Sequence, residues 1–313
     1  MSNNAKYSVV IPVFNEEESI DKTYDRLKKV MDSVNEPYEL IFVNDGSKDK
    51  SAELIKKLCS VDNNVKLMDF SRNFGHQVAI TAGMAESTGD AVVVIDADLQ
   101  DPPEVIPEMI EKWKEGYEVV YGKRTRRKGE SFFKRITASL FYRIIKKLTT
   151  VDIPIEVGDF RLIDRKVCQA LISIGERGRY VRGLVSWVGF RQTFVEYVRD
   201  KRFAGCTKYP LGKMIHLALD GITAFSTKPL EIATYIGFFL SSASFIYLLV
   251  VIYEKFFTKN TVAGWSSIMA ISLFFNGVVL IILGIIGEYI GRIYEESKGR
   301  PLYIVREKVG FKD

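Results

Sequence analysis

Short apolar runs alternate with amphipathic segments from the start of the chain to Lys123. The runs are apolar along nearly their whole length, which predicts buried strands, and the segments between them place apolar residues at helical spacing. The predicted strands are 7–13, 38–43, 65–70, 91–95 and 118–121. The predicted helices are 17–34, a segment capped by Ser47 that reaches Leu58, 77–87 and 103–114. This alternation predicts an α/β fold with a mostly parallel, doubly wound sheet.

Two late segments, 232–253 and 265–287, contain no formal charge. Each is long enough to cross a hydrocarbon core about 30 Å thick, so we expect two transmembrane helices. The connector 254–264 is short, which predicts an antiparallel hairpin with both ends on one side of the membrane. That side is richer in Lys and Arg than the connector, which places both termini and the α/β part in the cytoplasm. The basic residues concerned are Lys208, Lys213, Lys228, Arg292, Lys298, Arg300 and Arg306, against Lys255 and Lys259 in the connector.

Two further segments are amphipathic. Residues 131–148 carry apolar positions at helical spacing with basic residues opposite, which fits either a core-packed helix or one lying in the membrane interface. Residues 211–225 predict a juxtamembrane helix. The expected organisation is a catalytic domain at 1–210, a juxtamembrane segment at 211–228, two transmembrane helices within 229–290 and a cytoplasmic tail at 291–313.

Composition narrows the class of protein. Of 313 residues, 47% are hydrophobic and the net charge is +5, with basic residues beside apolar helical faces. That pattern favours an anionic membrane surface over nucleic acid as the partner. The three cysteines form no C-x-x-C pair, so neither a zinc site nor a disulfide framework is expected. Residues 1–6 are polar, so no signal peptide is expected and the setting of the α/β part is reducing.

Polar residues follow several of the predicted strands, where ligands of such sheets bind. The strongest signal is Asp96-Ala97-Asp98, directly after the apolar run 91–95. Two carboxylates at a strand end are costly to hold together unless a cation neutralises them, and Mg²⁺ or Mn²⁺ shared with substrate phosphates fits that need. Gln100 adds a neutral oxygen ligand, and a solvated loop is the alternative. Other strand-end residues are Asn15, Glu16, Asp45, Arg72 and Asn73.

Three motifs in this order resemble the family 2 glycosyltransferases, which have the Rossmann-like GT-A fold. They are Val9-Val-Ile-Pro-Val-Phe-Asn-Glu-Glu17, Phe42-Val-Asn-Asp-Gly-Ser47 and Asp96-Ala-Asp98. The resemblance implies that Asp45 recognises the nucleotide base and that Asp96 and Asp98 hold a metal ion and the diphosphate. It implies a nucleotide-sugar site that consists of Pro12, Phe14, Glu16, Asp45, Asp96, Ala97, Asp98 and Arg124.

Later motifs resemble the polyprenyl-phosphate sugar synthases, a group that includes the dolichyl-phosphate mannose synthases. They are Gly158–Leu162, Arg179–Gly183 and the stretch Arg202–Tyr209. Two more, Gly287–Glu295 and Lys298–Ile304, resemble the bacterial bactoprenol glucosyltransferase branch with its two-helix anchor. Two residues depart from the wider pattern: Cys206 replaces another small residue, and Asp159 stands where the dolichol enzymes often have serine, which favours the bacterial branch.

Transfer to a lipid phosphate requires positive charge around the nucleophile and the leaving diphosphate. Arg124 and Arg127 are candidates, and the acceptor phosphate is assigned to Arg126, Arg202 and Lys208. A phosphate is already ionised near neutral pH, so no strong general base is required. Asp98 and Asp159 are the expected catalytic carboxylates, with Asp159 orienting the acceptor or stabilising charge at the sugar. His76 is interpreted as a packing or hydrogen-bonding residue, and His216 as an interfacial one.

The expected function is inverting transfer of a hexose, glucose from UDP-glucose, onto undecaprenyl phosphate at a bacterial plasma membrane. Expected partners are the nucleotide sugar, the lipid and the membrane, with a homo-oligomer left open. Alternatives are a GDP-mannose or modified-sugar donor, a non-catalytic binding subunit, and a processive polysaccharide synthase, which has more membrane spans. A dinucleotide dehydrogenase is excluded because no G-x-G-x-x-G follows the first strand.

Overall fold

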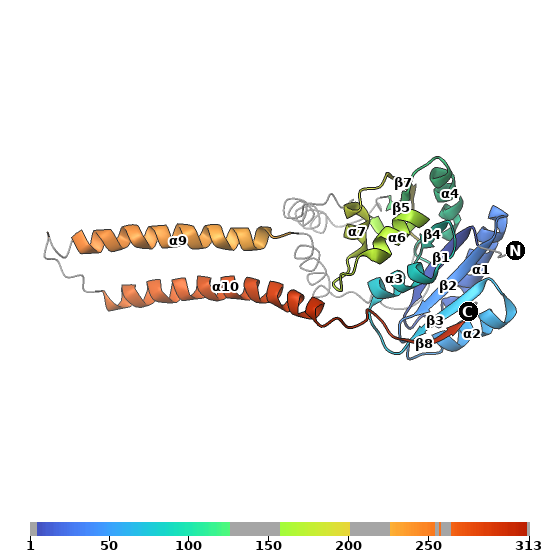
Figure 1. Ribbon diagram of the computed structural model, residues 1–313, viewed down its shortest axis with the longest axis horizontal. Helices are drawn as coiled ribbons and strands as arrows, with labels where there is room; N and C mark the ends of the chain where they lie inside the picture. The colour runs from blue at the N-terminus through green and yellow to red at the C-terminus, as the bar shows by residue number, and fades with distance from the viewer. Residues whose placement is uncertain (1–4, 126–156, 201–225, 254–256, 258–263, 312–313) are drawn as a thin grey trace.

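The computed structural model describes residues 5–125, 157–200, 226–253, 257 and 264–311. Its centre is one mixed sheet with the strand order β7-β5-β6-β4-β1-β2-β3-β8 (Figure 1). The strands are β1 Tyr7–Val13, β2 Tyr38–Asn44, β3 Val65–Phe70, β4 Ala91–Val94, β5 Val119–Arg124, β6 Val157–Asp164, β7 Gln192–Tyr197 and β8 Val305–Val309.

Helices cover both faces of this sheet. They are α1 Ile20–Val34, α2 Ser51–Val61, α3 His76–Glu86, η1 Pro103–Val105, α4 Ile106–Lys114, α6 Arg165–Ser173 and α7 Val181–Trp187. Successive residues of a strand point to opposite faces. Val9 and Ile11 of β1 therefore pack in the cluster with α1, α2 and α4, whereas Val10 packs in the cluster with α3, α6 and α7. Two buried faces explain why the strands read as unbroken apolar runs.

The predicted α/β sheet is confirmed, with one change of topology. Strands β4, β1, β2 and β3 pair in parallel, as predicted. The fifth predicted strand, β5, does not continue this parallel set, because β6 lies between β4 and β5 and runs antiparallel to both. The sheet is therefore parallel at its centre and mixed towards its edges.

The prediction that Ser47 caps the second helix was wrong. Helix α2 begins at Ser51 and its N-cap residue is Lys50. Ser47 instead accepts a hydrogen bond at its Oγ from the backbone N–H of Asn15, at 2.9 Å. The hydroxyl therefore joins the loops after β1 and β2.

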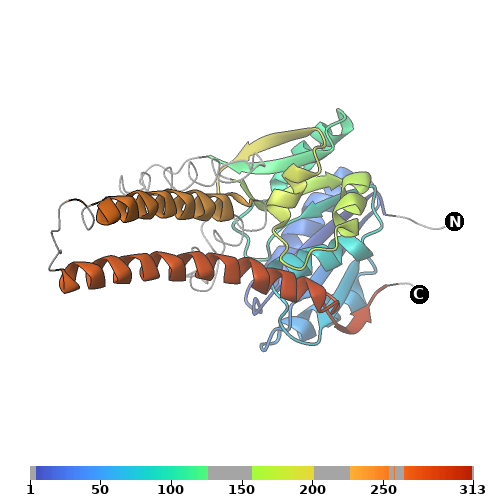
Figure 2. The same cartoon turned by 60° about the vertical axis from the view of Figure 1, so that its left-hand side comes forward.

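Two long helices, α9 Lys228–Tyr253 and α10 Trp265–Ser297, run side by side away from the sheet domain and back (Figure 2). Within them, Lys228–Tyr247 and Phe274–Ser297 are long and apolar enough to cross a membrane, with mean hydropathies of 1.3 and 1.9. Helix α10 extends beyond the predicted end at residue 287, as far as Ser297.

The chain after α10 returns to the sheet domain. Strand β8 pairs antiparallel with β3 and forms one edge of the sheet. Tyr303 stacks on the buried Phe70 with ring centroids 5.1 Å apart. The segment predicted as a cytoplasmic tail is thus partly built into the sheet domain. The predicted segments 131–148 and 211–225, and the residues Arg126, Arg127, Cys206, Arg202, Lys208 and His216, lie outside the described residues.

Candidate active site

The loops at the carboxyl ends of β1 and β2 are joined to each other. Asn15, at a positive φ of 52°, accepts from the backbone N–H of Lys48 at 2.8 Å, and the Glu16 N–H donates to Ser51 Oγ at 3.0 Å. Among the expected nucleotide-pocket residues, Pro12 is buried in β1, while Phe14 is 36% exposed and Glu16 is half-buried in this loop. The strand end therefore presents an exposed aromatic ring beside a carboxylate.

Asp45, expected to recognise the base, anchors the next loop. Its buried carboxylate accepts from the backbone N–H groups of Phe74 and Gly75, at 2.6 and 2.9 Å. Burial raises the pKa of Asp45 although these hydrogen bonds act in the opposite direction. The neighbouring Gly46 has a positive φ of 66°, and a Cβ there would lie 2.4 Å from the carbonyl carbon of Arg72. The loop after β3 is therefore packed tightly against the loop after β2.

The Asp96-Ala97-Asp98 segment directly follows the apolar run 91–95, as predicted, although β4 itself ends one residue earlier, at Val94. The Ala97 carbonyl accepts from Thr23 Oγ1 at 2.9 Å, which ties the segment to α1. Asp98 is 7% exposed, and its Oδ1 accepts from the backbone N–H of Gln100 at 3.1 Å. Leu99 between them has a positive φ of 56°, so the loop turns sharply after the second carboxylate.

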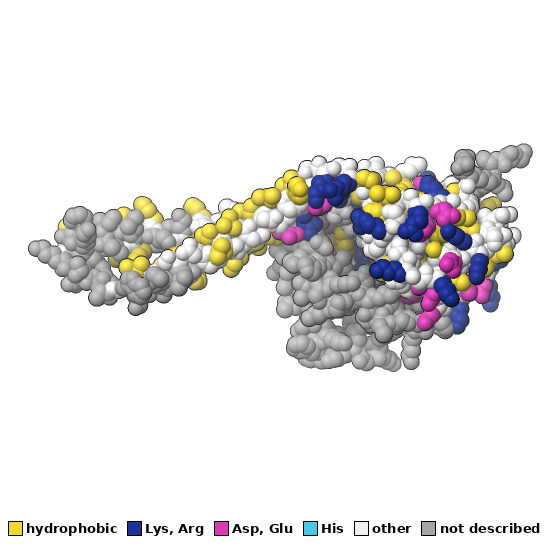
Figure 3. Space-filling view, turned by 90° about the horizontal axis from the view of Figure 1, so that it is seen from below, with side chains coloured by type: hydrophobic (Ala, Val, Ile, Leu, Met, Phe, Trp, Pro, Cys, Tyr) yellow, Lys and Arg dark blue, Asp and Glu magenta, His cyan; other side chains and the backbone are white. Residues whose placement is uncertain are grey.

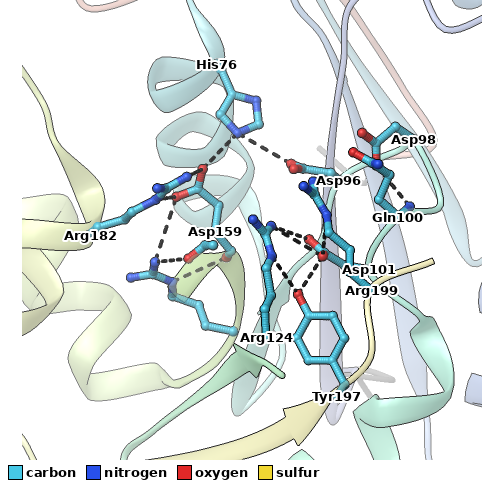
Figure 4. A network of polar contacts seen from close by, with 12 residues as sticks. His76, Asp96, Asp98, Gln100, Asp101, Arg124, Asp159, Arg182, Tyr197 and Arg199 are labelled. Atoms are coloured by element: carbon cyan, nitrogen blue, oxygen red, sulfur yellow. Dashed lines mark hydrogen bonds and ion pairs between the residues drawn. The ribbon is translucent and has the colours of Figure 1, made fainter. Parts of the chain in front are cut away.

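Asp159 lies at the centre of a charged cluster (Figure 4). Arg182 of α7 donates to both of its carboxylate oxygens, at 2.9 and 3.0 Å. His76 Nε2 lies 3.2 Å from Asp159 Oδ2 and 3.4 Å from Asp96 Oδ1, so the imidazole bridges the two carboxylates. Gln77 Nε2 also donates to Asp159 Oδ2, at 3.4 Å. The first turn of α3, the end of β4 and strand β6 therefore meet at this point.

The protonation of this cluster follows from its charges. Burial alone would raise the pKa of Asp159, but Arg182 and His76 hold it well below its usual range. Burial alone would lower the pKa of His76, but Asp96 and Asp159 outweigh it and raise that pKa to about 9. Asp159 is thus an ionised carboxylate whose oxygens are already engaged by donors, which is unsuited to removing a proton.

A second cluster surrounds Asp101, which is 0% exposed. Tyr197 of β7 donates to Asp101 Oδ1 at 2.5 Å, and Arg124 Nη2 lies 3.3 Å from each carboxylate oxygen. Arg124 Nε also donates to the Tyr197 hydroxyl at 3.2 Å, and Arg199 Nε lies 3.6 Å from Asp101 Oδ1. Arg124, expected at the nucleotide sugar, is therefore held by side chains within the chain itself.

The oxygen ligands that Asp96 and its neighbours offer fit a divalent cation. Asp96 Oδ1 is buried and accepts no hydrogen bond from the described residues, although His76 Nε2 lies 3.4 Å away. Asp98 supplies a second carboxylate two residues further on. The described part of the chain contains no group of three or more His, Cys, Asp and Glu side chains arranged to hold a metal. Two carboxylates, with the Gln100 amide oxygen as the expected third ligand, suit an ion that shares its remaining positions with substrate oxygens.

The sequence analysis missed several members of both clusters. Arg182 lies inside the Arg179–Gly183 motif but was given no role, and Asp101 lies three residues after Asp98. Tyr197, Arg199 and Gln77 carry no local signal, because their partners are distant along the chain. His76 was interpreted as a packing or hydrogen-bonding residue, and its Nε2 lies 3.2 Å from Asp159 Oδ2.

The chain is similar to known glycosyltransferases along nearly its whole length. Residues 8–172 match glycosyl transferase family 2, and residues 228–293 match the GtrB C-terminal hairpin. The uncharacterized glycosyltransferase YkcC of Bacillus subtilis (strain 168) is 61% identical over 313 residues, which cover 100% of this chain and 97% of that protein. The bactoprenol glucosyl transferase of Shigella phage SfV is 45% identical over 303 residues, which cover 97% of this chain and 99% of that protein. The prophage bactoprenol glucosyl transferase homolog of Escherichia coli (strain K12) is 44% identical over 301 residues, with 96% and 98% covered. The chain therefore belongs to glycosyl transferase family 2 and carries a GtrB-type C-terminal hairpin.

Proposed function

We propose that this glycosyltransferase transfers glucose from UDP-glucose to undecaprenyl phosphate, with inversion at the sugar carbon. The proposal rests on one observation. Asp96 and Asp98 lie together with two clusters that contain arginine, at the carboxyl ends of the parallel strands, and the same chain carries an apolar hairpin. Relatives that cover nearly the whole chain are bactoprenol glucosyl transferases, which supports the lipid acceptor and the sugar.

The negative charge on the diphosphate of the nucleotide sugar must be neutralised. Asp96, Asp98 and Gln100 would hold Mg²⁺ or Mn²⁺, which would supply positive charge for the leaving diphosphate. Pro12, Phe14 and Glu16 would line the nucleotide pocket at the ends of the first loops. Asp45 would recognise the nucleotide base. Its carboxylate also accepts the hydrogen bond that holds the loop carrying Phe74.

The acceptor end needs no general base. The second pKa of a phosphate is about 6, so the nucleophilic oxygen is ionised near neutral pH. Asp159 fits this requirement, because its pKa is held low and its oxygens are engaged by Arg182 and His76. We assign it to orientation and charge stabilisation. Arg126, Arg202 and Lys208 remain the proposed ligands of the acceptor phosphate.

The catalytic domain would face the cytoplasm, with both termini on that side of a bacterial plasma membrane. Figure 3 shows apolar side chains along the hairpin and Lys and Arg side chains gathered where it meets the domain. Arg292, Lys298 and Arg300 belong to that stretch of the chain. Basic residues at this end of the hairpin favour the cytoplasmic side.

Membranes that contain the protein, incubated with a panel of radiolabelled nucleotide sugars, test the proposal. Label from UDP-glucose should enter an organic-solvent extract. Label from GDP-mannose instead would overturn the choice of donor while keeping the reaction class. Binding of nucleotide sugar with no extractable product from any donor would indicate a non-catalytic subunit.

A further inference from the structure

Asp101, Tyr197 and Arg124 form a chain of hydrogen bonds beside the Asp96-Ala97-Asp98 segment (Figure 4). Arg124 Nε donates to the Tyr197 hydroxyl at 3.2 Å, and that hydroxyl donates to Asp101 Oδ1 at 2.5 Å. Arg124 Nη2 returns to the same carboxylate at 3.3 Å. The two bonds leave the guanidinium with a fixed direction, because Tyr197 and Asp101 hold two of its nitrogens at once.

The surrounding backbone is shaped to admit this chain. A Cβ on Gly158 would lie 2.4 Å from Arg124 Nη2, and a Cβ on Gly122 would lie 2.7 Å from the ring of Tyr197. Tyr197 and Arg124 are also direct partners in the pairing of β5 with β7. Side chains larger than glycine at either position would displace the arginine or the tyrosine.

The carboxylate end of this hydrogen-bonded chain is buried, and the arginine end is partly exposed to solvent. Asp101 is 0% exposed, whereas the Arg124 side chain is 28% exposed. Among the hydrogen bonds that Arg124 makes within the described residues, none uses Nη1. Arg199 Nε lies 3.6 Å from Asp101 Oδ1 and adds a second cation near this carboxylate.

We propose that Asp101 and Tyr197 are positioning residues, which orient Arg124 so that its outer donors bind the diphosphate group of the nucleotide donor. A planar guanidinium can bind phosphate oxygens with two parallel hydrogen bonds, and it does so best when its orientation is fixed beforehand. Asp101 lies three residues after Asp98, so the same short loop bears the metal-binding carboxylate and the anchor of the cation. The inference rests on the proposed function, because that function supplies the diphosphate.

The test compares binding of UDP with binding of uridine by calorimetry on the full-length protein in detergent. Tyr197→Phe removes the hydroxyl without changing any charge. It should weaken UDP about tenfold, the size expected for a hydrogen bond to a charged group, and leave uridine unchanged. Arg124→Lys keeps the charge but loses the planar guanidinium that can bind two phosphate oxygens at once. It should therefore also weaken UDP and leave uridine unchanged.

Tyr24→Phe is the matched control. Tyr24 donates to Asp62 at 2.9 Å, and Lys28 pairs with the same carboxylate, so a tyrosine, a cation and an aspartate are combined as they are around Asp101. Asp62 precedes β3, however, whereas the proposed site lies where strands end. This variant should bind both ligands as the wild type does. A change in its binding would show that loss of any tyrosine hydroxyl perturbs the site, which would overturn the inference.

Asp101→Asn separates positioning from simple charge. If Asp101 positions Arg124, this variant should bind UDP more weakly. If the carboxylate only cancels positive charge, its removal should tighten UDP, and that result would overturn the inference, as would equal losses for UDP and uridine in Tyr197→Phe. Wild-type protein that binds UDP but makes no lipid-linked product would refute the proposed function and leave the positioning role standing. Wild-type protein that binds UDP no more tightly than uridine would overturn both.

Discussion

Arg182 and Asp159 form a bidentate ion pair, with Arg182 Nε 2.9 Å from Asp159 Oδ1 and Arg182 Nη2 3.0 Å from Asp159 Oδ2. The arginine belongs to α7 and the carboxylate to β6, and His76 of α3 completes the cluster. The Asp159 side chain is 5% exposed, so its charge depends on these partners rather than on water. This pair is therefore expected to matter for stability as well as for catalysis.

Arg182→Gln should destabilise the protein by about 3 kcal/mol, the lower end for breaking a buried ion pair, because the arginine is partly exposed. The melting temperature in detergent should fall by several degrees. Asp159→Asn combined with Arg182→Gln should recover part of the loss, since no carboxylate is then left without its main partner. A double variant whose loss equals the sum of the single losses would show that the two side chains are not coupled.

Metal removal should abolish transfer. Asp96, Asp98 and Gln100 are the proposed ligands, so EDTA should stop lipid labelling and added Mg²⁺ or Mn²⁺ should restore it. Asp98→Asn should lose activity with an unchanged melting temperature in EDTA. Asp62→Asn, at a carboxylate outside the site, is the control and should remain active. Full activity in EDTA would remove the metal from the account.

The segment between α10 and β8 should support the nucleotide site. Tyr303 stacks on Phe70, Phe70 contacts Phe74 edge to face, and the Phe74 N–H is bound by Asp45. Tyr303→Ala should therefore raise the apparent KM for the nucleotide sugar by several-fold and lower stability by about 1–3 kcal/mol.

Tyr294→Ala, at a 61% exposed tyrosine of α10, is the matched control and should change neither quantity. Tyr303→Ala with normal KM and lowered stability would restrict the segment between α10 and β8 to a role in folding.

Membrane topology can be measured with single cysteines in a variant without the three native ones. A cysteine at position 260, between α9 and α10, should react with an impermeant reagent added outside the cell. A cysteine at position 308, in β8, should react only after the membrane is opened. The reverse pattern would place the catalytic domain outside the cytoplasm.

The elements of the fold were more predictable than their pairing. Apolar runs such as Tyr7–Val13 identify buried strands locally, and the four parallel strands β4, β1, β2 and β3 lie where the pattern placed them. The insertion of β6 between β4 and β5, and the pairing of β8 with β3, depend on contacts between distant parts of the chain. Hydrophobic periodicity contains no information about such partners.

The site divides in the same way. Asp96 and Asp98 were predictable because they directly follow a strand whose apolar run is unmistakable. The engagement of Asp159 was not, because its partners His76 and Arg182 are 83 and 23 residues away. The same holds for Arg124, whose anchors Asp101 and Tyr197 are 23 and 73 residues away.

The central claim is the transfer of glucose from UDP-glucose to a polyprenyl phosphate, and its most direct measurement uses purified protein and defined lipids. Radiolabelled UDP-glucose is supplied with undecaprenyl phosphate or with undecaprenol, which lacks the phosphate, in the presence of Mg²⁺. The account predicts label in the organic extract with the phosphate only, and none with Asp98→Asn. Equal labelling of undecaprenol, or no labelling of undecaprenyl phosphate by active, folded protein, would contradict it.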